Sequence, residues 1–140
     1  MKKKIFLVGL LILSVFLTSA KKSKKANSKY VASTSWVAAI AQLAGIDEID
    51  TIAPAELKHP PEYEITSKDI LKVSKSELFI YAGYEAMMNT ISTATKIDKQ
   101  KIVKISTKNQ VEVLESAVAL LAEKAGTSAI ANQRVSEYKK

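Results

Sequence analysis

The sequence predicts an α/β fold, a parallel four-stranded sheet flanked by helices. Short apolar segments alternate with helical patterns, and the connections between them are short. This alternation is typical of parallel sheets with right-handed crossovers. The predicted strand at residues 77–82 contains a continuous apolar run after Glu77, as expected for a strand buried on both faces. A chain of 140 residues is long enough for one domain with a real core and too short for two full ones.

Each predicted strand is a short apolar run bounded by polar or turn-forming residues. The four runs are residues 30–34, 50–53, 77–82 and 102–105. The first run ends in the hydroxyl residues Ser33 and Thr34, and Pro54 closes the second. Residues 55–64 follow the second strand as a loop.

Each predicted helix has an apolar side at helical spacing. The helices are residues 36–44, 66–73, 85–94 and 110–138. In the first helix Trp36 shares a face with Ile40, so we expect Trp36 to pack in the core. Thr66 or Ser67 can cap the second helix, and the last is interrupted near Gly126.

Residues 1–20 have the composition of a secretory signal peptide. Three lysines precede an uncharged apolar run at residues 5–17, and small residues follow, with cleavage expected after Ala20. The alternative is a permanent transmembrane anchor, but a spanning helix needs roughly 20 apolar residues. Residue 20 is not cysteine, so no acyl anchor can form there. We therefore expect an exported protein, in the periplasm or at the outer face of the cytoplasmic membrane.

Residues 21–29 form a Lys-rich segment that is predicted to be a flexible tether, able to associate weakly with anionic lipid headgroups. This segment and the signal peptide explain the net charge of +7, because residues 1–29 contain eight lysines and no acidic residue. Residues 30–140 contain 13 Lys and Arg against 14 Asp and Glu. A nucleic-acid-binding protein would carry its basic residues on the folded part, so we expect no nucleic-acid partner.

The composition also limits the chemistry of any site. The chain has no cysteine, which excludes disulfides, thiolate metal sites and cysteine nucleophiles. It has one histidine, His59, so no site can take two imidazoles from a single chain. Phosphate-binding loops and catalytic triads have no counterpart in the sequence, and we expect neither an enzyme nor an organic cofactor.

Ligands of parallel sheets bind at the carboxyl ends of the strands, which points to three loops. Residues 33–35 follow the first strand, where capping of the next helix is the alternative to lining a cleft. His59 follows the second strand and can bind zinc or manganese, or it can be an exposed loop histidine. Glu85 follows the third strand, as a metal ligand or as a helix-start carboxylate. Glu62 is a third candidate ligand, although loop glutamates usually face water.

Five short motifs, in this order and spacing, resemble the N-terminal lobe of solute-binding proteins from zinc/manganese ABC importers. They are VASTSW at 31–36, IAP at 52–54, HPPEYE at 59–64, SKDI at 67–70 and YAGYE at 81–85. The resemblance implies one lobe of a two-lobe protein, apparently truncated. Residues 30–109 would be the metal-binding lobe, and residues 110–140 would resemble the start of the helix that connects the lobes.

The resemblance implies capture of a divalent transition metal, zinc or manganese, outside the cytoplasmic membrane. The implied ligands are His59, Glu85 and Glu62, and the implied partners are a permease, its ATPase and a missing second lobe. Two departures from the family pattern stand out: Pro61 occupies the place of the usual histidine before Glu62, and residues 106–109 lack the second histidine.

Two other functions remain open at this point. The chain could be a non-transport remnant or a small exported interaction protein built on the same lobe. A small exported hydrolase using Ser33 or Ser35 is a more distant alternative.

Overall fold

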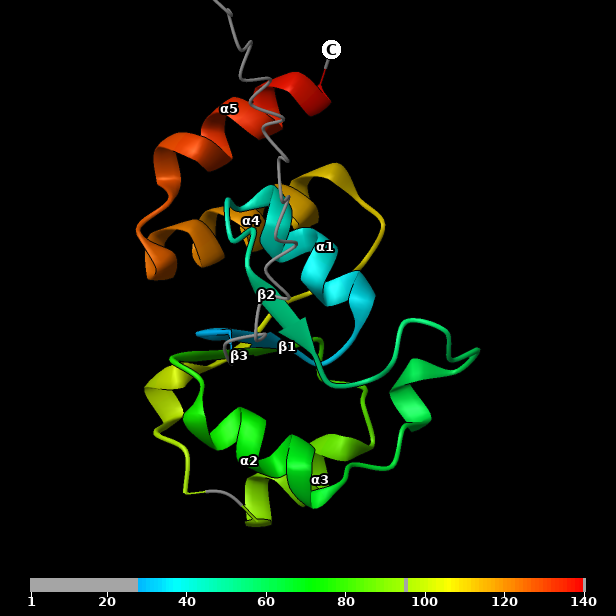
Figure 1. Cartoon of the computed structure of the whole chain (residues 1–140). Coiled ribbons are helices and arrows are strands. Elements are labelled where there is room, and N and C mark those ends of the chain that lie inside the picture. Colours follow the sequence, from blue (N-terminus) through cyan, green and yellow to red (C-terminus); the bar gives the residue numbers. More distant parts are fainter. Residues whose placement is uncertain (1–27, 95, 140) are drawn as a thin grey trace, which may run out of the picture.

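The computed structural model describes residues 28–94 and 96–139 and contains a parallel four-stranded sheet between two layers of helices (Figure 1). The sheet order is β2-β1-β3-β4. The strands are β1 (Tyr30–Ala32), β2 (Ile49–Thr51), β3 (Leu78–Tyr81) and β4 (Ile102–Lys104). The predicted fold class is therefore confirmed. The predicted signal peptide, and the predicted tether up to residue 27, lie outside the described residues.

The helices divide between the two faces of the sheet. They are α1 (Ser35–Leu43), α2 (Ser67–Lys75), α3 (Met87–Ala94), α4 (Val111–Ala125) and α5 (Ser128–Tyr138). Helices α1, α4 and α5 lie on one face, and α2 and α3 lie on the other (Figure 1). Each of the four helical segments predicted from periodicity contains a helix.

The pleat of the central strands explains their continuous apolar sequence. Val31 and Phe79 are buried with residues of α2 and α3, whereas their neighbours Ala32 and Ile80 are buried with residues of α1 and α4. Successive side chains of a strand point to opposite faces, so a sheet covered on both sides needs apolar residues at every position.

Helices α4 and α5 are separated where the sequence predicts a break. Gly126 caps α4 in the left-handed conformation, with φ of 72°, which glycine adopts without a Cβ penalty. Beyond it, the Thr127 hydroxyl donates a hydrogen bond to the Ala44 carbonyl at the end of α1, at 2.5 Å. Arg134 of α5 pairs with Asp47, at 2.7 Å. These contacts fold α5 back onto the α1 side, and the role of this segment as an inter-lobe helix stays a prediction.

Trp36 does not pack in the core as predicted; it is 54% exposed. The buried residues of α1 are Val37, Ala38, Ile40 and Ala41, and Ala44 follows them. Val37, Ile40, Ala41 and Ala44 follow the i, i+3, i+4, i+7 spacing of one helix face, and Trp36 lies about 100° away from Val37 around the axis. The apolar face predicted from the sequence is therefore one residue too early.

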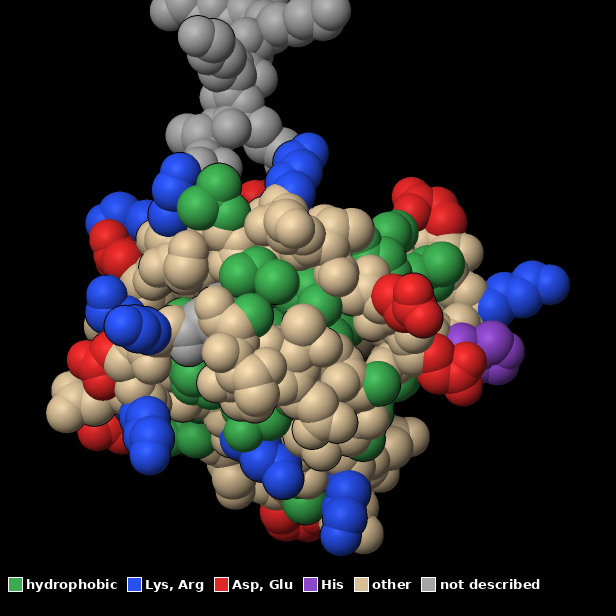
Figure 2. All heavy atoms as spheres, turned by 90° about the horizontal axis from the view of Figure 1, so that it is seen from below, with side chains coloured by type: hydrophobic (Ala, Val, Ile, Leu, Met, Phe, Trp, Pro, Cys, Tyr) green, Lys and Arg blue, Asp and Glu red, His purple; other side chains and the backbone are tan. Residues whose placement is uncertain are grey.

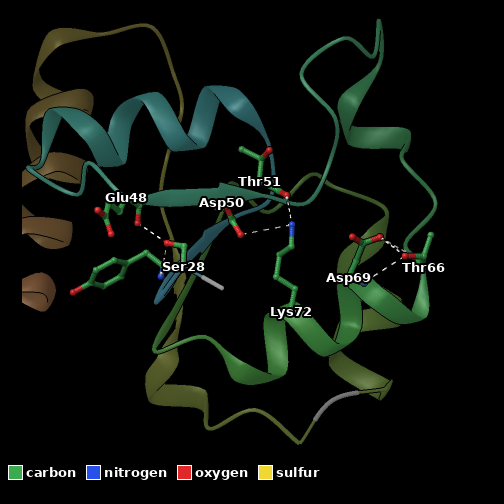
Figure 3. Close-up of polar contacts among 8 residues, drawn as sticks. Ser28, Glu48, Asp50, Thr51, Thr66, Asp69 and Lys72 are labelled. Atoms are coloured by element: carbon green, nitrogen blue, oxygen red, sulfur yellow. Dashed lines mark hydrogen bonds and ion pairs between the residues drawn. The ribbon is translucent and has the colours of Figure 1, made fainter. Parts of the chain in front are cut away.

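Two described residues of the predicted tether are bonded to the domain. The Ser28 hydroxyl donates to the Glu48 carbonyl at 2.5 Å (Figure 3), and the Lys29 carbonyl accepts a hydrogen bond from the Glu77 N–H at 2.7 Å. The Lys29 ammonium also pairs with the Glu77 carboxylate at 3.1 Å. Among the described residues, no helix combines the length and apolar character needed to cross a bilayer.

Candidate functional site

The loops after β1, β2 and β3 meet at the carboxyl edge of the sheet because the backbone ladder continues past the strand ends. The Ser33 N–H donates to the Ile80 carbonyl of β3 at 2.8 Å, and the Ala53 N–H donates to the Ser33 carbonyl at 2.9 Å. Ser33 therefore lies between the continuations of β2 and β3. This is the edge at which the sequence predicts a site.

The hydroxyl residues after β1 have structural roles. Thr34 is the N-cap of α1, and its Oγ1 accepts a hydrogen bond from the Val37 N–H at 3.4 Å. Ser33 is fully buried, and its hydroxyl donates to Oε1 of Glu85 at 2.5 Å. Capping, one of the two roles predicted for this segment, is confirmed for Thr34. The hydroxyl of Ser33, one of the two proposed nucleophiles, is already engaged with a carboxylate.

Glu85 is a buried carboxylate, 4% exposed, and its two oxygens accept four hydrogen bonds. Oε1 accepts from the Ser33 hydroxyl and from the Ala82 N–H at 2.8 Å. Oε2 accepts from the N–H groups of Gly83 at 2.6 Å and Tyr84 at 3.0 Å. A carboxylate offers about four lone-pair positions, so this group is fully used.

The pKa of Glu85 reflects the balance between burial and these hydrogen bonds. Burial by itself raises the pKa, because it disfavours the charged form. The hydrogen bonds from the Ser33 hydroxyl and from backbone N–H groups stabilise the carboxylate and outweigh that effect, so the pKa is lowered. The side chain is therefore an ionised anchor that holds the turn 82–84 against the end of β1.

The sequence does not predict this role for Glu85; it indicates a metal ligand or a helix-start carboxylate. Helix α3 begins only at Met87. Ser33 and Glu85 are 52 positions apart, and no local pattern links them. In the described arrangement Glu85 could bind a metal only by giving up one or more of its present donors.

His59 and Glu62 lie on a loop that is held to the turn after β3. Residues Pro60–Glu62 form a 3-10 turn with His59 at its N-cap position, and the Glu62 N–H donates to the His59 carbonyl at 3.0 Å. The Pro61 carbonyl accepts a hydrogen bond from the Ala86 N–H, also at 3.0 Å. The loop of His59 thus reaches the segment of Glu85 through the backbone, as the sequence predicts for this edge.

The side chains of these two residues face solvent, unlike that of Glu85. Both residues are exposed, and Figure 2 shows the histidine at the periphery of the molecule with acidic side chains beside it. Among the described residues, no three His, Cys, Asp or Glu side chains come close enough to hold a metal ion. The ligand set of His59, Glu62 and Glu85 therefore stays a prediction.

The other end of the loop is fixed by Asp69 at the start of α2. Oδ2 of Asp69 accepts from the Tyr63 hydroxyl at 3.0 Å, and from the Thr66 hydroxyl and N–H at 2.6 and 3.0 Å. Thr66 Oγ1 accepts from the Asp69 N–H in return, which completes a capping box (Figure 3). Burial raises the pKa of Asp69, but the hydrogen bonds from Thr66 and Tyr63, together with the charge of Lys72, lower it overall.

The fold is similar to solved structures of periplasmic metal-binding proteins. The Mn-bound and the Cd-bound periplasmic metal-binding protein from Candidatus Liberibacter asiaticus each match with a TM-score of 0.56 and 17% identity, over 78% of this chain and 50% of theirs. The laminin-binding protein Lbp of Streptococcus pyogenes matches with a TM-score of 0.55 and 14% identity, over 79% of this chain and 51% of its own.

These similarities concern the fold. The chain spans about half the length of the structures that it matches, and it has the architecture of one lobe of a solute-binding protein. No protein-family model and no curated protein sequence matches the chain.

Proposed function

We propose that this chain is an extracytoplasmic metal-binding module that captures a divalent transition metal, zinc or manganese, for an ABC importer. The observation that carries the proposal is the fold, which matches half of a periplasmic protein solved with Mn and with Cd. Export by the signal peptide at residues 1–20, and delivery to a permease with its ATPase, belong to the same proposal.

The metal would bind at the loop of His59, with Glu62 as the second ligand. A neutral imidazole and a carboxylate are both ligands of zinc and manganese. The bonds of Pro61 to Ala86 and of Tyr63 to Asp69 brace the loop on both sides of Glu62. A braced loop loses little conformational freedom on binding, which favours affinity.

Two or three ligands do not complete a metal site, and this limits the proposed affinity. Zinc in a closed site takes four protein ligands, so water or a second lobe would occupy the remaining positions. Glu85 would join as a third ligand only if metal binding displaced donors such as the Ser33 hydroxyl. We therefore expect weak binding by this chain alone.

Calorimetric titration of the exported chain with Zn²⁺ and with Mn²⁺ tests the proposal. We expect His59→Ala to weaken binding more than about tenfold and Glu62→Ala to weaken it severalfold. Glu123→Ala is the matched control, because Glu123 is an exposed acid on α4, outside the proposed site. If His59→Ala and the parent chain bind both metals equally, His59 is not a ligand and the proposed site is wrong.

Glu85→Gln answers a separate question in the same titration. Glutamine keeps one side-chain oxygen in the turn but removes the negative charge, which makes it a much weaker ligand for zinc or manganese than a carboxylate. If Glu85 only anchors the turn, this variant binds the metal as the parent does, provided that it is folded. A loss as large as that of His59→Ala would instead make Glu85 a ligand that leaves its present donors on binding.

A further inference from the structure

A second feature of the carboxyl edge lies beside β4 and carries positive charge. A hollow of about 470 Å³ is lined by Ala82 and Tyr84, which follow β3, and by Lys104, Ser106, Thr107 and Lys108 at the end of β4 and beyond it. It lies next to the same turn after β3 that holds Glu85. None of the metal-ligand candidates lines it.

The two lysines of this hollow have no anionic partner among the described residues. Neither Lys104 nor Lys108 forms an ion pair within residues 28–94 and 96–139. The nearby carboxylate of Glu85 already accepts four hydrogen bonds, so it is not available to either ammonium group. The adjoining hollow of about 430 Å³ shares both lysines, and there Glu112 is the acidic lining residue.

The position of Lys104 depends on a glycine. A Cβ built on Gly83 would lie 2.6 Å from Nζ of Lys104 and 2.2 Å from its Cε, so a side chain at position 83 would require the lysine side chain to move. Gly83 also has a φ of 98°, a conformation that other residues rarely adopt. The lysine side chain therefore lies directly against the turn, at the wall of the hollow.

Two residues with hydroxyl side chains also line this hollow. Ser106 and Thr107 line it, and within the described part of the chain neither hydroxyl has a hydrogen-bond partner. Ammonium and hydroxyl groups are the donors that proteins use for carboxylate and phosphate oxygens. A divalent cation would be repelled by the two lysines at this place.

We propose that this hollow binds an oxyanion, a carboxylate or phosphate group, held by Lys104 and Lys108 with the hydroxyls of Ser106 and Thr107. The group could belong to a small free anion or to an acidic side chain of a protein. The exposed ring of Tyr84 at the rim offers apolar contact to the organic part of a carboxylate. The proposal is independent of metal binding at His59, since it uses different residues and a ligand of opposite charge.

The test is calorimetric titration of the exported chain with three probes: inorganic phosphate, succinate and a hexaglutamate peptide. We expect at least one probe to bind the parent, and the double variant Lys104→Gln/Lys108→Gln to bind it about tenfold more weakly. Lys75→Gln is the matched control, because Lys75 is an exposed lysine on α2, on the other face of the sheet. It should leave the affinity unchanged.

The three probes separate the two sources of the oxyanion. Binding of phosphate or succinate identifies a small free anion, and binding of the peptide alone identifies an acidic protein partner. The proposal is overturned if no probe binds the parent, or if the double variant binds as the parent does. An equal loss with Lys75→Gln would show attraction to net charge alone, and it would overturn the proposal as well.

Gly83→Ala adds a test that leaves the charge unchanged. The added methyl group must displace the side chain of Lys104, so the affinity for the probe should fall severalfold with both lysines still present. Circular dichroism and thermal unfolding establish whether this variant is folded. If it is not folded, the lysine variants decide the proposal, because exposed side chains such as these contribute little to the stability of the fold.

Discussion

Two neighbouring segments at the carboxyl edge, the turn at residues 82–85 and the loop at residues 55–64, use their polar groups in opposite ways. In the turn, the buried carboxylate of Glu85 accepts bonds from one hydroxyl and three backbone N–H groups. In the loop, the backbone is fastened through Pro61 and Tyr63, while the side chains of His59 and Glu62 face solvent. A backbone hydrogen bond from the N–H of Ala86, the residue after the turn, to the carbonyl of Pro61 links the two segments.

The difference separates structural polar groups from groups that are free to bind a ligand. A carboxylate with all its lone pairs engaged stabilises the native turn, and a ligand can reach it only by breaking those bonds. A braced loop with free side chains presents ligand atoms at little cost in stability. We therefore expect substitutions in the turn to change stability, and substitutions in the loop to change binding.

The largest expected effect is the loss of stability in Glu85→Ala. The substitution leaves the Ser33 hydroxyl and three backbone N–H groups without their acceptor in a buried place. Each unsatisfied buried donor costs about 1–3 kcal/mol, and partial relaxation reduces the sum, so we expect a loss of about 3 kcal/mol. Urea denaturation measures it, with Glu62→Ala as the exposed control. A loss below about 1 kcal/mol would mean that the four bonds do not hold the turn.

An intermediate effect is expected from acid. The pKa values of Glu85 and Asp69 are lowered in the folded protein from ordinary values of 4.5 and 3.8. A carboxyl group with a lowered pKa stabilises the fold at every pH above its ordinary pKa. This contribution is lost as the pH falls from the ordinary pKa through the lower pKa of the folded state. We therefore expect the free energy of unfolding to decrease as the pH drops below about 4.5.

Glu85→Gln identifies the share of this acid sensitivity that belongs to the turn. The variant should be less stable at neutral pH but lose less of its remaining stability in acid, because glutamine does not titrate in this range. Urea denaturation at several acidic pH values measures how steeply the free energy of unfolding falls with pH in the variant and in the parent. Glu123→Gln on α4 is the exposed control. Equal slopes for Glu85→Gln and the parent would contradict the assignment.

The sequence predicts the layers of this fold well because burial leaves a local pattern. Residues 78–82 are apolar without alternation, and they contain the strand that is covered on both faces. The predicted break near Gly126 is confirmed. It was predictable because a left-handed C-cap strongly favours glycine. Trp36 shows the limit of such patterns, since an error of one residue moves a side chain from the core to the surface.

The polar bonds of the site are predictable only where they are local. Thr66 is a cap that the sequence predicts. Asp69, three residues later, has the spacing of a capping box, which is a further local signal for this bond. The bond from Ser33 to Glu85 joins residues 52 positions apart, and it exists only because β1 and β3 are neighbours in the sheet. The strand order decides that pairing, and no short motif encodes the order.

The smallest expected effect is that of His59→Ala on stability in the absence of metal. The hydrogen bonds that hold the loop are accepted by the backbone carbonyls of His59 and Pro61. An alanine at position 59 keeps its backbone carbonyl, so these bonds remain. We expect the free energy of unfolding to stay within about 0.5 kcal/mol of the parent, as for other exposed side chains.

With excess Zn²⁺ the parent should gain stability, since a ligand that binds only the native state stabilises it by mass action. The variant should gain much less. Thermal unfolding with and without Zn²⁺ measures both effects, and Glu123→Ala should follow the parent in each condition. A loss above about 1 kcal/mol without metal would make the imidazole a structural group, and the contrast between the loop and the turn would then disappear.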